Sequence, residues 1–249
     1  MTTWPTMWEI VGRTGHFDYI EFDSQSGAYD LHDQDNICRA AELTKTGSML
    51  KVDGAAKGWL ATRAIAAGFE AILFADVNTA EEAKQCVEAV RIAPEGSHGA
   101  AITRGTYADV DDWVRRSDDV VIAIMIERKT LMDNLEKVLR IDGLDMINFG
   151  PLDYGLSMRT PGKALRHTLK ESELKEKIET DRDKINRKAI EAGIRPRVEA
   201  DSLVGIQYFL ERGIQDFCIG SDVNSIQEWC KENGKKIRDA LGASQRVLT

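Results

Sequence analysis

Val120-Val-Ile-Ala-Ile-Met-Ile-Glu127 is the stretch that decides the fold of this chain. Seven apolar residues, five of them β-branched, lead directly into a carboxylate. A continuous apolar run without helical spacing predicts a strand buried on both faces. Because side chains alternate along a strand, Glu127 is expected on the same face as Met125 and Ala123. A charge at the C-terminal end of such a strand is typical of an α/β active site. The alternative is a carboxylate that only leaves the core where the strand ends.

A second predicted strand lies within Gly143-Leu-Asp-Met-Ile-Asn-Phe-Gly-Pro-Leu-Asp153 and is followed by its own carboxylate, Asp153. Between the two strands, residues 129–140 carry apolar side chains at helical spacing. A strand–helix–strand unit of this length makes the strands parallel, so Glu127 and Asp153 leave the same edge of the sheet. Two carboxylates without a neighbouring His or Cys suit a hard divalent cation such as Mg²⁺ or Mn²⁺ better than zinc.

The composition is that of a globular chain: 249 residues, 43% hydrophobic and 30% charged, with a formal net charge of −8. The negative charge argues against nucleic acid or an anionic membrane as a partner. No apolar run approaches the roughly 20 residues that a membrane helix needs. The first residues lack the basic start and apolar core of a signal peptide. The four cysteines show no metal-ligand spacing. We therefore expect a reduced, cytoplasmic protein with no nucleic-acid and no membrane partner.

Predicted strands and helices alternate along the chain. The seven strands are expected at residues 17–23, 48–53, 70–76, 120–127, 144–149, 197–200 and 216–220. Strict alternation predicts a parallel sheet, and the length is usual for a (β/α)₈ TIM barrel that forms a single domain over residues 1–249. The eighth strand is expected at the start, as a short, curtailed first strand at Thr2-Thr-Trp4. A doubly wound open sheet is the alternative, but no glycine-rich phosphate loop follows an early strand.

The carboxyl ends of the predicted strands carry one basic residue among many carboxylates. These end residues are Asp23, Lys51, Asp53, Asp76, Glu127, Asp153 and Asp222. In a barrel this edge forms the active site, and its charge again indicates a bound cation. Alternation turns Leu50 and Val52 toward the helices, so Lys51 is expected to face the barrel axis. There it is expected to pair with Asp53 or Asp76.

Five motifs resemble those of one enzyme family. They are Phe22-Asp-Ser-Gln-Ser-Gly27, Ala67-Gly-Phe-Glu-Ala-Ile-Leu-Phe74, Ile126-Glu127, Asn148-Phe-Gly-Pro-Leu-Asp153 and Gly213-Ile-Gln-Asp-Phe-Cys-Ile-Gly-Ser-Asp222. In these motifs, which span most of the chain, the sequence is similar to the HpcH/HpaI aldolases. Members of that family are metal-dependent class II aldolases with a (β/α)₈ barrel, and they handle the enolate of pyruvate.

The resemblance implies a set of site residues. It implies that Glu127 and Asp153 bind Mg²⁺, Mn²⁺ or Co²⁺. It further implies that backbone N–H groups near Leu152 and Asp153, in the turn that begins with Gly150 and Pro151, receive the carboxylate of a small 2-oxo acid. The family commonly forms hexamers, or trimers of dimers, so a homo-oligomer is expected.

Three positions depart from the family pattern. Ser26 stands where the family has a histidine that assists proton transfer, and serine does not titrate near neutral pH. Lys51 is expected to replace an arginine that stabilises the enolate, as a point charge instead of a planar fork. Met125 stands where the family often has glutamine.

The remaining candidates lie around the same edge. With the histidine absent, Asp23, Asp76 or a metal-bound water is expected to take the proton of the substrate hydroxyl. Gln25 and Ser26 are expected to contact the substrate. Aromatic residues near the loops of this edge are candidates to line the pocket: Trp4, Trp8, Tyr29 and Tyr154.

Three functions fit these residues. The first is a metal-dependent carbon–carbon lyase that reversibly splits a 4-hydroxy-2-oxo acid into pyruvate, or a close 2-oxo acid, and an aldehyde. The second keeps the enolate chemistry but changes the reaction to decarboxylation, or to condensation with an acceptor other than an aldehyde. The third is a barrel that binds a 2-oxo acid without turning it over. The sequence favours the first, and it does not identify the aldehyde.

Overall fold

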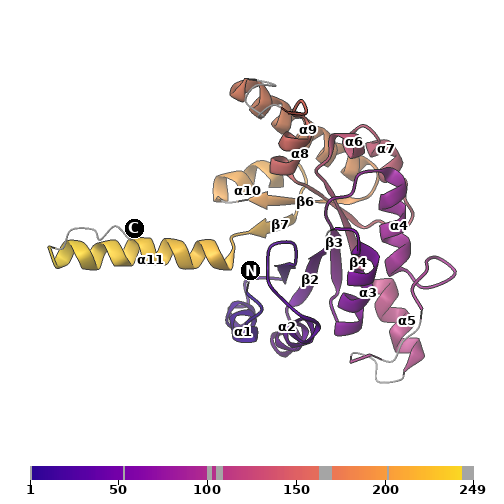
Figure 1. Cartoon of the computed structure of the whole chain (residues 1–249), viewed down its shortest axis with the longest axis horizontal. Coiled ribbons are helices and arrows are strands. Elements are labelled where there is room, and N and C mark those ends of the chain that lie inside the picture. Colours follow the sequence, from indigo (N-terminus) through magenta and orange to yellow (C-terminus); the bar gives the residue numbers. More distant parts are fainter. Residues whose placement is uncertain are drawn as a thin grey trace.

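A curved sheet of seven parallel strands forms the centre of the computed structural model, which describes residues 2–52, 54–99, 103–104, 109–162, 170–200 and 202–242 (Figure 1). The strands follow one another in chain order: β1 (Tyr19–Asp23), β2 (Gly47–Val52), β3 (Ala71–Phe74), β4 (Val121–Ile126), β5 (Met146–Phe149), β6 (Arg195–Ala200) and β7 (Asp216–Ile219). Each coincides with one of the seven predicted strands to within three residues at either end. The curled parallel sheet with helices outside confirms the barrel-like α/β class.

Helices connect the strands and, with the exception of the last, α11, surround the sheet (Figure 1). They are α1 (Pro5–Arg13), α2 (Leu31–Thr44), α3 (Lys57–Ala67), α4 (Ala80–Val90), α5 (Val110–Asp119), α6 (Lys129–Met132), α7 (Leu135–Val138), α8 (Pro151–Ser157), α9 (Glu171–Glu191), α10 (Leu203–Leu210) and α11 (Asp222–Ala240). The single helix predicted at residues 129–140 was wrong. Asn134 leaves helical geometry there, with a φ of −112° and a ψ of 17°, and two short helices form instead.

Alternation along β4 divides the core into two parts. Ile122, Ile124 and Ile126 pack outward with the helices in the large apolar cluster, and all three are fully buried. Ala123 and Met125 belong to a smaller cluster inside the curve of the sheet. The predicted faces of this strand are therefore confirmed, and the inward face leads directly to Glu127.

The sheet is open between β7 and β1. The predicted first strand at Thr2-Thr-Trp4 does not form, because no strand in the described chain pairs with that segment and Pro5 already begins α1. The Thr2 N–H instead donates to the carboxylate of Asp222 after β7, at 2.7 Å. Side chains also bridge the opening: the Tyr19 hydroxyl on β1 donates to the Phe217 carbonyl on β7, at 3.2 Å.

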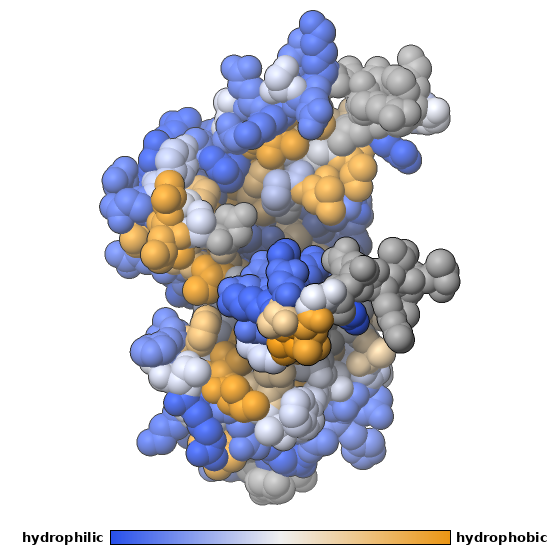
Figure 2. All heavy atoms as spheres, turned by 90° about the vertical axis from the view of Figure 1, so that its left-hand side faces the viewer, coloured by the Kyte–Doolittle hydropathy of each residue, from blue (hydrophilic) through white to orange (hydrophobic). Residues whose placement is uncertain are grey.

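Helix α11 extends away from the rest of the molecule (Figure 1), and none of its residues is buried. It still carries large apolar side chains, among them Val223, Ile226, Trp229 and Ile237. Figure 2 shows apolar surface gathered on the face from which this helix projects. Within the described residues, no helix is long and apolar enough to cross a membrane.

The four cysteines are free thiols, as expected. Cys38 and Cys86 lie in the core, and burial raises the pKa of each to about 12. Both are therefore protonated and unreactive at neutral pH.

Candidate metal and substrate site

Glu127 is a buried carboxylate at the end of β4, 3% exposed. Its Oε1 accepts the backbone N–H of Asp76 at 2.6 Å. Asp76 adopts a left-handed backbone with a φ of +54°, which is unusual for a residue other than glycine. Burial raises the pKa of Glu127, while the Asp76 N–H and the Lys51 charge oppose that shift. The strained turn after β3 therefore supplies a donor to a carboxylate that burial alone would disfavour.

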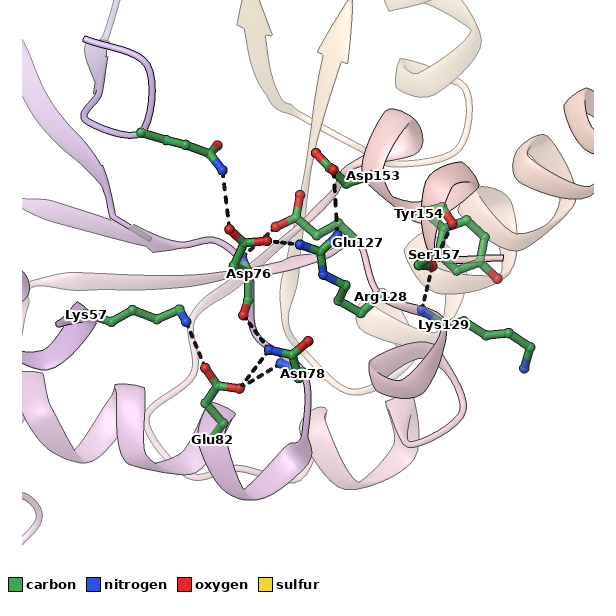
Figure 3. Close-up of polar contacts among 11 residues, drawn as sticks. Lys57, Asp76, Asn78, Glu82, Glu127, Arg128, Lys129, Asp153, Tyr154 and Ser157 are labelled. Carbon is green, nitrogen blue, oxygen red and sulfur yellow. Dashed lines mark hydrogen bonds and ion pairs between the residues drawn. The ribbon is translucent and has the colours of Figure 1, made fainter. Parts of the chain in front are cut away.

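Gly150 lies directly against this carboxylate. A Cβ at position 150 would lie 2.8 Å from the Glu127 Cβ and 2.9 Å from its Oε2, so only glycine fits without a shift. Pro151 follows as the first residue of α8, where its missing N–H costs nothing. This tight turn places Asp153 in the first turn of α8, close enough to Glu127 for the two charges to interact (Figure 3).

Arg128 joins two further carboxylates at the same mouth. Its Nη2 pairs with Asp76 Oδ1, and its Nη1 lies 3.6 Å from Asp153 Oδ1 (Figure 3). Sequence reasoning missed Arg128. Its position immediately after Glu127 was a signal, but the direction of a side chain beyond a strand end does not follow from alternation.

Lys51 lies on β2, two strands before β4 in the sheet, and its charge reaches Glu127. It shares the inward face with Met49, whereas Leu50 and Val52 are fully buried among the outward residues, as alternation predicts. Among the described residues its partner is Asp23, not the predicted Asp76. The Lys51 Nζ lies 3.6 Å from Asp23 Oδ2, because Asp23 on β1 is directly opposite it in the parallel register. Asp76 is held by Arg128 instead, and Asp53 lies outside the described residues.

Other predicted site residues lie around these charges. Gln25 Nε2 donates to Asp76 Oδ2 at 3.4 Å, and Ser26 follows in the same exposed turn. Pro151 and Leu152 lie at the surface of the mouth, and Leu152 is 75% exposed. Trp4 is exposed before α1, where its backbone bonds with Thr2 and Met7.

The other aromatic candidates lie away from the mouth. Trp8 is buried in the outer core, so it does not line a pocket there. Tyr154 is also buried, with its hydroxyl donating to Asp181 on α9 at 2.6 Å. Tyr29 packs edge-on against Phe22, at 5.5 Å between ring centroids. Their apolar bodies stabilise the helix layer.

The donor set fits a hard divalent cation. Among the described residues named above, four carboxylates and two cations lie at the mouth, so negative groups outnumber positive ones there. Within the described residues, no group of three or more His, Cys, Asp or Glu side chains forms a complete metal cage. Mg²⁺ and similar ions are commonly held by only one or two carboxylates, with water and substrate oxygens as the other ligands. Glu127 and Asp153 are two carboxylates of this mouth whose charges lie close enough to interact.

Known proteins resemble this chain in sequence. Residues 2–226 match the family model described as HpcH/HpaI aldolase/citrate lyase. A hydroxypyruvate/pyruvate aldolase of Agrobacterium fabrum is 28% identical over 224 residues, which cover 88% of this chain and 79% of that protein.

Solved structures show the same fold. An HpcH/HpaI aldolase from Desulfitobacterium hafniense matches with a TM-score of 0.82 at 19% identity, over 96% of this chain and 90% of that chain. A citrate lyase beta subunit from M. tuberculosis, complexed with oxaloacetate and magnesium, matches with a TM-score of 0.51 at 10% identity, over 88% of this chain and 87% of that chain.

Gly150→Ala tests the tight approach to Glu127. The added Cβ would push the Glu127 side chain aside, so we expect divalent-metal affinity to fall by on the order of 10-fold or more, as for displaced metal-supporting groups. Titration calorimetry with Mn²⁺ measures the affinity. Gly205→Ala is the matched control, because its Cβ would meet only the Ser202 Oγ at 3.4 Å. Equal affinities of the two variants would contradict the crowding argument.

Glu127→Gln should separate metal binding from folding. Metal binding should weaken severely, because one of two ligands becomes a neutral amide. Because the pKa of Glu127 is raised in the folded protein, ionising this carboxyl group destabilises the metal-free fold. The destabilisation is absent at acidic pH, where Glu127 is protonated, and it develops as the pH rises through the folded-state pKa. The glutamine variant should therefore unfold at a higher temperature than wild type at mildly alkaline pH, in a chelator. Calorimetric scans across pH test this, and unchanged metal affinity would refute the ligand assignment.

Proposed function

Because the chain belongs to the HpcH/HpaI aldolase/citrate lyase family, we propose that it is a class II aldolase. The enzyme is a carbon–carbon lyase that reversibly cleaves a 4-hydroxy-2-oxo acid into pyruvate, or a close 2-oxo acid, and an aldehyde. One observation carries this proposal: Glu127 and Asp153 lie within electrostatic reach of each other at the carboxyl edge of the sheet, with Lys51 and Arg128 near them.

Glu127 and Asp153 would hold the divalent ion, with Mg²⁺, Mn²⁺ and Co²⁺ as the candidates. A bound ion of this kind supplies a Lewis acid for the 2-oxo group of the substrate. Carboxylates outnumber cations among the described residues of the mouth, so a divalent cation would offset their charge and favour the anionic substrate. Gly150 leaves room for the Glu127 side chain, because a Cβ at position 150 would crowd it.

The turn into α8 would orient the substrate carboxylate. The first N–H groups of a helix have no partners within it, so those of Leu152 and Asp153 are available to an anion at the mouth. The exposure of Leu152 keeps this turn accessible. Gln25 and Ser26 would contact the other end of the substrate, since their loop reaches Asp76. Trp4 would lie further out on the same edge.

Lys51 would stabilise the negative charge that develops on the 2-oxo oxygen as the carbon–carbon bond breaks. Its ammonium is held by Asp23 at 3.6 Å, a distance that leaves it able to turn toward a substrate. Asp23 and Asp76 are the carboxylates placed to accept the proton of the 4-hydroxyl group. Asp76 is bound by Arg128 and Gln25, which fix its carboxylate at the mouth, where a base would have to stand.

A second reaction class is favoured by one observation. Ser26 occupies the loop position where the family's histidine would stand, and it is exposed. A site without that base is suited to enolate chemistry that needs less proton transfer, such as decarboxylation of a 2-oxo acid.

Parallel assays test the assignment. Aldol cleavage and condensation would be measured with pyruvate and a series of aldehydes, beside oxaloacetate decarboxylation, all with added Mn²⁺. The proposed function predicts aldol turnover that is lost in Glu127→Gln. Decarboxylation alone would favour the second reaction class. Binding of pyruvate without either reaction would indicate a barrel that binds a 2-oxo acid and does not turn it over.

Lys51→Met tests the role of the lysine. Because Lys51 is partly exposed at the mouth and pairs only with Asp23 in the described contacts, the variant should fold and bind Mn²⁺ like wild type. Turnover should fall by on the order of 10²-fold, the scale for removing one oxyanion partner. Steady-state kinetics beside thermal unfolding make the measurement. A variant that is more stable and equally active would show that the family's arginine has no replacement at position 51.

We also propose that residues 1–249 form one barrel domain that assembles into a homo-oligomer, a hexamer or trimer of dimers by family resemblance. Two features support self-association. Apolar residues of α11 recur at spacings of three, four and seven residues, at Val223, Ile226, Cys230 and Ile237. This spacing places them along one side of the helix. The body exposes apolar side chains as well, including Leu203 and Val204 of α10. A second copy that covers both surfaces would remove them from water.

Ile226→Glu should weaken that assembly. A charge on the apolar side of α11 would have to be buried at the contact, whereas Ser225→Glu places the same charge on another side of the helix. Sedimentation should give an oligomer for wild type and for Ser225→Glu, and smaller species for Ile226→Glu. A wild-type chain that sediments as a monomer would contradict the proposed assembly.

A further inference from the structure

Arg197 is a fully buried cation inside the curve of the sheet, on β6. Its side chain is 0% exposed, and each nitrogen has a partner. Nη2 lies 2.5 Å from Glu21 Oε2, Nε donates to the Tyr19 hydroxyl at 2.7 Å, and Nη1 donates to Asn148 Oδ1 at 3.0 Å. Glu21 and Tyr19 are on β1, so the guanidinium spans the opening of the sheet, where β1 and β6 share no backbone pairing.

Glu21 depends on this partner for its charge. Burial raises the pKa of Glu21, and the charges of Arg197 and Lys51 oppose that shift, Arg197 the more strongly. An ionised carboxylate in such a place is stable only when it is paired. Two cations are therefore within electrostatic reach of one buried carboxylate, and Arg197 holds it directly.

Lys51 is the second of these cations, and it also acts on the site. Its ammonium opposes the raised pKa of Glu127 as well as that of Glu21. Glu21 precedes Asp23 by two residues on the inward face of β1, and Asp23 is the present partner of Lys51. The lysine thus lies between a carboxylate deep in the barrel and the carboxylates of the mouth.

We propose that Arg197 is a positioning residue for Lys51: by neutralising Glu21, it leaves the Lys51 ammonium at the mouth, where it can meet the substrate oxyanion. This inference rests on the proposed aldolase function. Without Arg197, the Glu21 carboxylate would draw Lys51 inward as its only remaining cation among the described contacts. The lysine would then no longer reach the substrate. This effect would occur although no direct contact joins Lys51 to Arg197 among the described residues.

A double-mutant cycle tests whether Arg197 acts through Lys51. Arg197→Met should lower kcat by on the order of 10-fold or more, part of the loss expected for removing the oxyanion partner itself. In the Lys51→Met background the same substitution should change kcat by less than about twofold, because residues that act through one group are not additive. An equal fold-loss in both backgrounds would overturn the proposal and leave Arg197 a purely structural residue.

Two compensating variants address folding. Arg197→Met with Glu21→Gln removes both charges, so no carboxylate competes for Lys51 and kcat should return to near the wild-type value. Arg197→Lys keeps the charge but not the planar fork, so kcat should stay near wild type while thermal stability falls. If either variant folds but its kcat is lowered by on the order of 10-fold, the loss expected for Arg197→Met, the proposal is wrong. These two variants decide the matter if Arg197→Met alone does not fold.

A measurement independent of turnover follows the lysine itself. Trace labelling with acetic anhydride, read by peptide mass spectrometry, gives the reactivity of Lys51 relative to an exposed lysine such as Lys129. Reactivity should fall in Arg197→Met and recover when Glu21→Gln is added. That pattern in an enzyme without aldol activity would refute the proposed function and support the positioning of Lys51. An active enzyme in which Lys51 labels equally in all variants would refute the positioning alone.

Discussion

The lack of space between Gly150 and Glu127 is the constraint on which the mouth of the barrel depends. Strands β4 and β5 are neighbours, so the chain leaving β5 must pass directly over the carboxylate at the end of β4. Only a residue without a side chain can do this, and the proline that follows starts a helix at once. The left-handed turn at Asp76 brings a third strand end to the same carboxylate. Three loops therefore converge on Glu127, and a change in any of them moves the others.

The sequence predicted the parts of the molecule that depend on local pattern. The apolar run before Glu127 defined a buried strand, and alternation turned Lys51 inward while Val52 packs outward. Contacts that depend on distant segments were not predictable in this way. Arg128 pairs with Asp76 from another strand end. Side-chain alternation along β6 places Arg197 on the inward face. Its partners on β1, however, are 176 and 178 residues away in the chain.

The interior of the sheet is divided into an apolar part and a charged part. Met49, Leu73 and Ala123 from the middle strands form a small apolar cluster. Strand β1, at one edge of the sheet, and β6, next to the edge strand β7, contribute Glu21 and Arg197 instead. A barrel with eight paired strands closes by backbone hydrogen bonds, whereas this sheet is bridged at its opening by side chains. The ion pair between Glu21 and Arg197 positions β1 relative to β6 more than it stabilises the fold, since buried ion pairs contribute little net free energy of folding.

The order of the strands also bears on how the chain folds. Each strand pairs with the one that precedes it in the sequence, so every new strand finds its partner already available as the chain lengthens. Pairing between strands that are consecutive in the sequence closes shorter loops than pairing between distant strands, so less loop entropy is lost at each step. The ties from β1 to β6 and β7 are the exception, because they cannot form until most of the chain exists. On a ribosome the apolar part of the barrel can therefore assemble first, and the charged part, with the correct setting of the mouth, is completed only near the end of synthesis.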